Sequence, residues 1–161
     1  MPAFNTNRMV GEYTQRCYVP SHRRHAKLSA DHLKAAKELA VWRRRVAGDW
    51  GKVKVEHVDA PAGDHLRVGA TFPVKVRVNL GSFAPEDVEV QLCHGVLDAM
   101  GEIADPRALA LVPESPNGTP SVLFSGSVPC DASGQFGFSV RVLPRHAHLP
   151  HAFEPGLVTW G

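Results

Sequence analysis

Two spacings of hydrophobic residues divide the chain near residue 50. Up to that point, apolar residues recur every three or four positions, a period that gathers them on one face of a helix. From Lys52 onward, apolar and polar residues alternate, which is typical of strands that bury one face. The change of period predicts a helical arm over residues 1–48 and a β domain over residues 49–161.

The first part of the arm carries one apolar stripe. Met9, Tyr13 and Cys17 follow one another at intervals of four residues, which aligns them on a helix running from about residue 7 to 18. Pro20 is expected to end this helix or to restart the chain after a turn, because proline lacks a backbone N–H.

A second helix is expected in the rest of the arm. Ser29 or Asp31 can cap its start, and Trp42 lies on its apolar face. Gly48 is a suitable stop near residue 47, since glycine adopts the left-handed conformation that often follows a helix.

The remainder of the chain contains seven short segments with strand-like patterns. Turn-forming Gly, Pro, Asp and Asn residues separate them. This spacing predicts a mainly β fold, an antiparallel β-sandwich of immunoglobulin type that follows the helical arm. The segments are residues 52–58, 72–79, 88–93, 108–112, 122–128, 135–142 and 157–160.

Composition limits the class of protein. Of the 161 residues, 43% are hydrophobic and 21% charged, which excludes wholesale disorder. No apolar run approaches the ~20 residues of a membrane helix, and the N-terminus lacks the apolar core of a signal peptide. Cys17, Cys93 and Cys130 are odd in number and widely spaced, which favours reduced thiols. We therefore expect a cytoplasmic protein with no membrane partner.

Charge is unevenly distributed. Residues 1–50 hold ten Lys and Arg against four Asp and Glu, whereas residues 51–161 hold eight against twelve. Basic runs such as Arg43-Arg44-Arg45 can bind nucleic acid or an acidic partner. Because no base-reading motif accompanies them, we interpret them as a solvated helix face and expect no nucleic-acid partner.

Candidate chemistry is sparse. His146, His148 and His151 are the densest group of metal-ligand types, but prolines bracket this loop and no Cys or acid at ligand spacing completes a site. Cys93 and His94 are adjacent in a predicted strand and must face opposite sides, so we expect a buried thiol and an exposed imidazole. The residues alone predict no catalytic and no metal site.

Four stretches carry a family resemblance that spans nearly the whole chain. Residues 4–14, FNTNRMVGEYT, are similar to the end of the catalytic region of bacterial α-glucan (maltodextrin or glycogen) phosphorylases. Residues 142–161 resemble the extreme C-terminus of these enzymes. Residues 94–102 and 128–138, which lie between, resemble the same terminal extension.

The resemblance implies that the chain is the C-terminal piece of a longer enzyme. Such enzymes use pyridoxal phosphate in the phosphorolysis of α-1,4-glucan to glucose 1-phosphate. The family's Schiff-base lysine and phosphate-contacting glycine segment lie upstream of residues 4–14. We therefore carry over no catalytic or cofactor-binding residue, and we expect the chain alone to be inactive.

What the resemblance places in this chain is a supporting helix. Arg8, Met9, Val10 and Tyr13 would pack under the upstream catalytic domain. Two positions depart from the family pattern: Gly11 stands where a longer residue is usual, and Cys17 stands where an aromatic residue is expected.

The partners follow from this interpretation. The upstream catalytic domain is the first, and the interface candidates are Arg8, Met9, Tyr13, Cys17 and Trp42. In the isolated chain, the exposed apolar stripe and the Trp42 face predict a homodimer or an arm folded back on the β domain.

Two alternatives stay open beside this accessory role. One is an independent carbohydrate-binding module for α-glucan, which needs a surface with at least two exposed aromatic residues. Trp42, Trp50 and Trp160 are its candidates, although packing between elements is the favoured interpretation. The other is an interaction adaptor that uses the basic helical arm.

Overall fold

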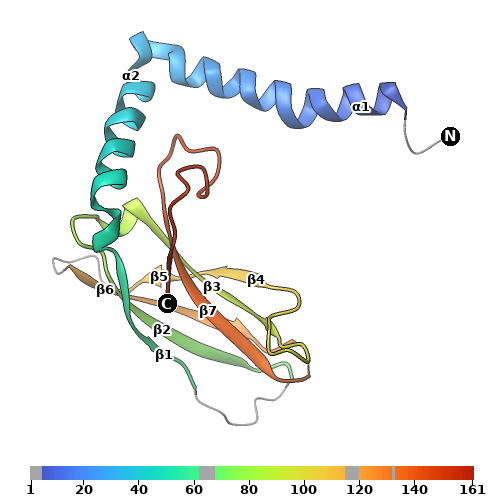
Figure 1. The fold of residues 1–161 in the computed structure, drawn as a ribbon, viewed down its shortest axis with the longest axis vertical. Coiled ribbons are helices and arrows are strands. Elements are labelled where there is room, and N and C mark those ends of the chain that lie inside the picture. The colour runs from blue at the N-terminus through green and yellow to red at the C-terminus, as the bar shows by residue number, and fades with distance from the viewer. Residues whose placement is uncertain (1–4, 62–67, 115–119, 132) are drawn as a thin grey trace. The chain divides into compact units, whose positions relative to one another are not determined.

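A computed structural model of the protein describes residues 5–61, 68–114, 120–131 and 133–161. The chain forms two compact units, Met1–Arg44 and Arg45–Gly161. We call the first the arm and the second the β unit (Figure 1). No helix of the described residues is long and apolar enough to span a membrane.

The arm begins with a run of helix that passes through Pro20. Helix α1 covers Thr6–Tyr13, a π-helical turn covers Thr14–Tyr18, and helix α2 covers Val19–Asp49. The expectation that Pro20 ends the helix is therefore wrong, because the helix continues through Pro20 although proline has no backbone N–H to donate. In the π turn before it, the N–H of Val19 donates to the carbonyl oxygen of Thr14, five residues back.

The arm breaks instead at residues 30–33, near the predicted cap. Ala30 is extended, and Asp31, His32 and Leu33 all have positive φ angles of 48°, 54° and 65°. Left-handed backbone is unfavourable for residues with a Cβ, so this short segment interrupts α2 (Figure 1). The helix boundary expected near Ser29 is thus present within α2.

The end of α2 differs from its predicted form. The helix passes through Gly48 to Asp49, and a 3₁₀ turn over Trp50–Lys52 follows it. Gly48 is not among the glycines with a positive φ, so it does not act as a left-handed helix stop. The 3₁₀ turn ends the helix, with the N–H of Val53 donating to the carbonyl oxygen of Trp50 at 3.0 Å.

The β unit contains two antiparallel sheets of four strands each. Sheet A has the order β1-β2-β6-β5, and sheet B has the order β4-β3-β7-β8 (Figure 1). The strands are β1 Lys54–Asp59, β2 Thr71–Asn79, β3 Val88–Val96, β4 Arg107–Ala110, β5 Val112–Pro113, β6 Ser121–Pro129, β7 Phe136–Pro144 and β8 Thr159–Trp160.

The predicted strand segments are confirmed, with one division. The segment expected over residues 108–112 splits at Leu111: β4 pairs with β3 in sheet B, and β5 pairs with β6 in sheet A. Leu111 is buried at the crossing point, and its N–H donates to the carbonyl oxygen of Val90 at 2.8 Å.

Alternate residues of the central strands form the core. The burial pattern of β2 is strictly alternating, and its neighbour β6 places Phe124 directly opposite Val76. Phe124 is the largest fully buried side chain of the described residues. In sheet B, the buried positions include Val90, Leu92, Val140 and Val142.

The outer strands of both sheets are short or irregular. Strands β5 and β8 have two residues each, and β4 has four. Strand β1 is longer, but its pairing with β2 shifts register between Val55 and His57. This shift is a bulge at Glu56, which lies between them.

Candidate functional sites

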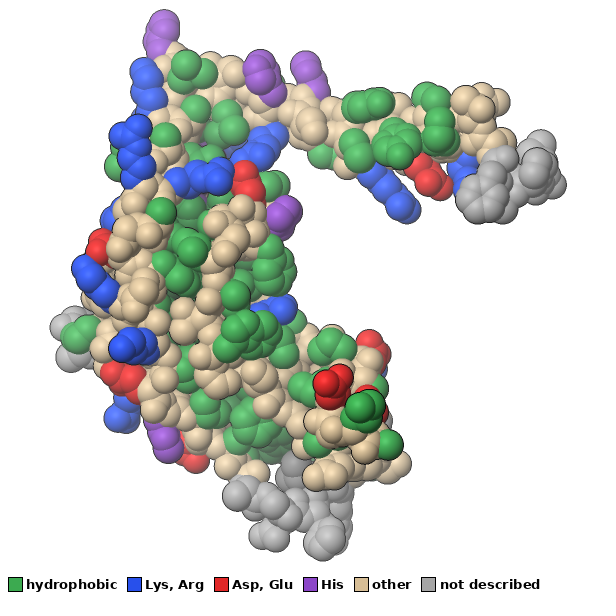
Figure 2. Space-filling view, in the orientation of Figure 1, with side chains coloured by type: hydrophobic (Ala, Val, Ile, Leu, Met, Phe, Trp, Pro, Cys, Tyr) green, Lys and Arg blue, Asp and Glu red, His purple; other side chains and the backbone are tan. Residues whose placement is uncertain are grey.

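The apolar stripe of α1 is exposed. Met9, Val10 and Tyr13 keep 50%, 53% and 52% of their surface accessible. Figure 2 shows hydrophobic side chains gathered along α1, with charged side chains beside them. The stripe is therefore available to a partner.

Short-range contacts set the polar border of this stripe. The side chain of Asn5 caps α1 by accepting the N–H of Arg8 at 2.7 Å. The Arg8 guanidinium lies 3.8 Å from the carboxylate of Glu12, and both side chains are about half exposed. Such an exposed pair contributes only about 0.3–0.5 kcal/mol, so Arg8 marks the border of the stripe rather than anchoring it.

The structure does not bring all five predicted interface residues together. Arg8, Met9 and Tyr13 lie on α1, and exposed Cys17 lies in the π turn, whose wider winding changes the spacing that the prediction assumed. Trp42 lies beyond the break at residues 30–33 and is buried. The expected exposed face at Trp42 is therefore not observed.

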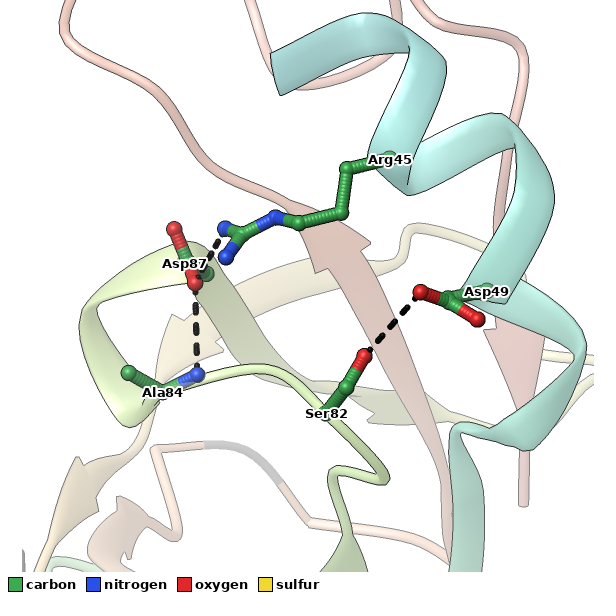
Figure 3. Close-up of polar contacts among 5 residues, drawn as sticks. All are labelled: Arg45, Asp49, Ser82, Ala84 and Asp87. Carbon is green, nitrogen blue, oxygen red and sulfur yellow. Dashed lines mark hydrogen bonds and ion pairs between the residues drawn. The ribbon is translucent and has the colours of Figure 1, made fainter. Parts of the chain in front are cut away.

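A polar network fixes the last turn of α2 within the β unit. The Arg45 guanidinium donates to Oδ2 of Asp87 at 2.6 Å, and the same oxygen accepts the N–H of Ala84 at 3.2 Å (Figure 3). The backbone carbonyl of Asp87 also accepts the N–H of Arg145 at 2.8 Å. One aspartate thus connects the helix end, the 3₁₀ turn Pro85–Asp87 and the chain after β7.

A second carboxylate completes this network. Oδ2 of Asp49 accepts the hydroxyl of Ser82 at 3.3 Å, and Oδ1 accepts the ammonium of Lys52 at 2.5 Å (Figure 3 shows the first contact). The hydrogen bond and charge of Lys52 hold the pKa of Asp49 below its usual value. The carboxylate therefore stays ionised and keeps both partners.

Aromatic packing lies beside these charges. Trp50 and Phe83 are both buried, with their ring centroids 5.7 Å apart. The Arg45 guanidinium carbon lies 5.3 Å from the centroid of Phe83, within the range of a cation–π contact. The ring of Phe83 therefore packs against both Trp50 and the Arg45 side chain.

The lysines do not suit a covalently bound cofactor. A Schiff-base lysine is activated by removal from water or by a nearby cation in an enclosed pocket. Every lysine of this chain is exposed: Lys27, Lys34, Lys37, Lys52, Lys54 and Lys75. The residues therefore do not fit pyridoxal phosphate, and we assign no step of a cofactor reaction to them.

The histidine-rich loop has a local structure of its own. The N–H of His148 donates to Nδ1 of His146 at 3.2 Å, and the two rings meet edge to face at 5.3 Å. In the part of the chain that the structure describes, no three His, Cys, Asp or Glu residues are grouped closely enough to hold a metal ion.

His94 differs from its prediction. It is buried, as is Cys93, so the expectation of an exposed imidazole is wrong. The inward-facing positions of β3 run through Leu92 to His94, which lies at the end of the strand. There it lines a pocket of 120 Å³ together with the paired side chains of Arg107 and Asp131.

The environment of His94 favours the neutral imidazole. Among the described residues, its Nδ1 atom is buried without a hydrogen-bond partner. Burial lowers the pKa of His94; the Asp131 carboxylate opposes this shift, and the Arg107 charge adds to it.

We expect the free energy of unfolding to fall as the pH is lowered through about 6.5, the usual pKa of histidine. The unfolded chain takes up this proton at a higher pH than the folded chain, so acid favours unfolding. Urea unfolding between about pH 7.5 and pH 5.5 measures this slope. His94→Leu should flatten it, whereas His57→Gln, at an exposed histidine, should keep it; an unchanged slope in His94→Leu would refute the assignment.

Comparisons with a family model and with individual known proteins point to the same family. The family model described as the glycogen phosphorylase C-terminal domain matches residues 50–161. A glycogen phosphorylase of Mycobacterium tuberculosis (strain H37Rv) is 32% identical over 159 residues, which are 98% of this chain and 18% of that protein. A maltodextrin phosphorylase of Thermococcus litoralis is 33% identical over 167 residues, which cover 99% of this chain and 18% of that protein.

These matches confirm the resemblance seen in residues 4–14 and in the C-terminal stretches. The chain spans about a fifth of the length of the curated relatives it matches. The family model begins at Trp50, so it covers nearly all of the β unit, whereas the relatives align with the arm as well. The chain belongs to the glycogen phosphorylase C-terminal domain family.

Proposed function

We propose that this chain is the C-terminal accessory region of an α-1,4-glucan phosphorylase and works without catalytic residues of its own. The parent reaction would be the phosphorolysis of α-1,4-glucan to glucose 1-phosphate, with pyridoxal phosphate held by the upstream domain. The names and lengths of the relatives support this proposal, since the chain matches about a fifth of each. The exposure of all six lysines is consistent with a cofactor site elsewhere.

The β unit is the rigid part of this proposal. We interpret its two sheets as an immunoglobulin-like sandwich, because each has antiparallel strands with alternating burial. The polar network around Asp87 and Asp49 fixes the last turn of α2 to it. In this proposal, the β unit supports the docking segment and carries no reaction of its own.

The exposed apolar stripe of α1 is the main observation that supports the proposal. Met9, Val10 and Tyr13 each leave about half of their surface in water. Full burial of an apolar side chain of this size contributes about 1.5–3 kcal/mol. Covering the exposed halves of these three side chains would therefore contribute to the free energy of binding. The partner that we propose for this stripe is the upstream catalytic domain.

The double variant Met9→Asp/Tyr13→Asp should weaken docking on the catalytic domain by roughly a hundredfold. Two carboxylates would lose their water on binding without gaining a partner. The measurement is calorimetric titration of the 161-residue chain into a glycogen phosphorylase that lacks its matching C-terminal part. Binding of the unaltered chain should also raise the Tm of that truncated enzyme.

Val41→Asp is the matched control. Val41 is an exposed apolar residue of α2 on the other side of the break at residues 30–33, so this change adds a charge to the arm outside the stripe. It should leave the affinity nearly unchanged. Equal affinities for the unaltered chain and the double variant would refute docking through the stripe. Sedimentation of the isolated chain at several concentrations would then show whether a second copy of the chain covers the stripe instead.

A further inference from the structure

A row of side chains crosses the outer face of sheet B. Arg141 of β7 lies directly opposite Gln91 of β3 on one side and Trp160 of β8 on the other. Residues directly opposite in antiparallel strands project from the same face. The neighbours of Arg141 in the strand, Val140 and Val142, are fully buried in the core, so the row lies on the outer face.

Two exposed aromatic residues lie next to the arginine. Trp160 is 57% exposed and Phe153 is 52% exposed. The guanidinium carbon of Arg141 lies 5.0 Å from the centroid of the Phe153 ring, which places this ring beside the row although it comes from the segment between β7 and β8. The outer face of sheet B therefore presents two exposed aromatic residues beside one arginine.

Hydrogen bonds hold the polar part of the row in place. Nε of Arg141 donates to Oε1 of Gln91 at 2.7 Å, and Nε2 of Gln91 donates to Oε1 of Glu89 at 2.5 Å. The guanidinium has four further N–H donors and the carboxylate a second oxygen, so the row offers both donors and acceptors to a ligand. One positive and one negative group balance, which suits an uncharged polyhydroxyl ligand better than an anion.

We propose that this surface binds an α-1,4-glucan chain. An exposed aromatic ring packs against the C–H face of a pyranose, and fixed donors and acceptors at its edge hydrogen-bond the hydroxyl groups. Adjacent strands are about 4.8 Å apart, so a row over three strands is about 10 Å long and matches a short oligosaccharide. We call it the glucan face, composed of Glu89, Gln91, Arg141, Phe153 and Trp160.

The residues of the face set the ligand class, a neutral sugar chain. The choice of an α-1,4-glucan among such chains rests on the proposed function. The two proposals remain separable, because docking depends on the stripe of α1 and sugar binding depends on sheet B. A chain that binds the sugar but not the catalytic domain would refute only the docking.

The test is affinity electrophoresis of the 161-residue chain in gels that contain glycogen, with maltoheptaose titrations followed by tryptophan fluorescence. We expect glycogen to retard the migration of the chain. Maltoheptaose should change the emission of Trp160, which is exposed, and leave that of Trp42 and Trp50 unchanged, because both are buried. Trp160→Ala should weaken binding by roughly tenfold or more, and Phe153→Ala should weaken it by a smaller factor. Trp160→Phe should keep most of the affinity and lose the fluorescence signal.

Tyr18→Ala is the control, since Tyr18 is an exposed aromatic residue of the arm. It should bind glycogen as the unaltered chain does. Because β8 has only two residues, thermal unfolding of each variant checks that the sheet is intact. Three outcomes would each overturn the proposal. The first is that millimolar sugar does not retard the chain, which would instead favour a protein partner for this face. The others are a loss of affinity in Tyr18→Ala equal to that in Trp160→Ala, or equal affinity for the β-linked cellohexaose.

Discussion

Phe124→Ala should lower the free energy of unfolding of the β unit by about 3–5 kcal/mol. Phe124 is only 1% exposed and lies in the centre of sheet A, opposite Val76. Its loss removes apolar contacts and leaves a cavity that the surrounding strands can close only in part. Because domains of this size are stable by about 5–15 kcal/mol in total, the variant should unfold at a much lower urea concentration.

Phe138→Ala is the matched control for this prediction. Phe138 belongs to β7 and is an exposed residue of the same type, so its loss should cost about 1 kcal/mol or less. Tryptophan fluorescence is the appropriate probe, since Trp50 is buried in the β unit and becomes exposed to water when this unit unfolds. Similar losses in both variants would mean that Phe124 is not a centre of the core.

Trp50→Ala should have the second large effect, again a loss of about 3–5 kcal/mol. Trp50 is buried against Phe83, directly after the helix end that Arg45 and Asp49 hold in place. Its removal would empty the apolar side of this junction and loosen the last turn of α2. Urea unfolding followed by circular dichroism measures the loss.

A milder variant tests the cause of the Trp50 effect. Among the described residues, the Nε1 atom of Trp50 is buried without a hydrogen-bond partner. Trp50→Phe keeps much of the ring contact and removes this donor, so it should cost less than Trp50→Ala. Trp160→Ala, at an exposed indole, should leave stability nearly unchanged. A Trp50→Phe variant as unstable as Trp50→Ala would mean that the indole makes contacts that a phenyl ring cannot replace.

The alternation of apolar residues was enough to predict the strands. Each central strand buries one face, so a period of two follows directly from the fold, as the burial pattern of β2 shows. The split at Leu111 could not be predicted. The pattern of residues 108–112 is compatible with pairing to β3 in sheet B or to β6 in sheet A, and the chain does both in turn.

Local rules failed at two positions, His94 and Pro20. Periodicity predicted the inward-facing apolar positions of β3 correctly, but the expected exposure of His94 was wrong, because this residue lies in a pocket lined by Arg107 and Asp131. Proline chemistry favoured a helix end at Pro20, yet the π turn before it lets the helix continue.

The candidate sites were only partly predictable. Met9 and Tyr13 were found from their helical spacing and are exposed as expected. The pair Arg45–Asp87 joins residues that are 42 positions apart, and the row from Gln91 through Arg141 to Trp160 depends on strand register. Register is set by pairing in the folded sheet, and a single sequence pattern does not specify it.

The short outer strands limit how this domain can meet other proteins. An exposed strand invites another chain to continue the sheet, which leads to edge-to-edge aggregation. Here β5 and β8 offer two residues each, β5 includes Pro113, and β1 carries a bulge at its centre. These three edges give an incoming strand few regular hydrogen bonds, which favours recognition through side chains. A homodimer of this chain, if it forms, should therefore assemble through helix faces and resist conversion into fibrils.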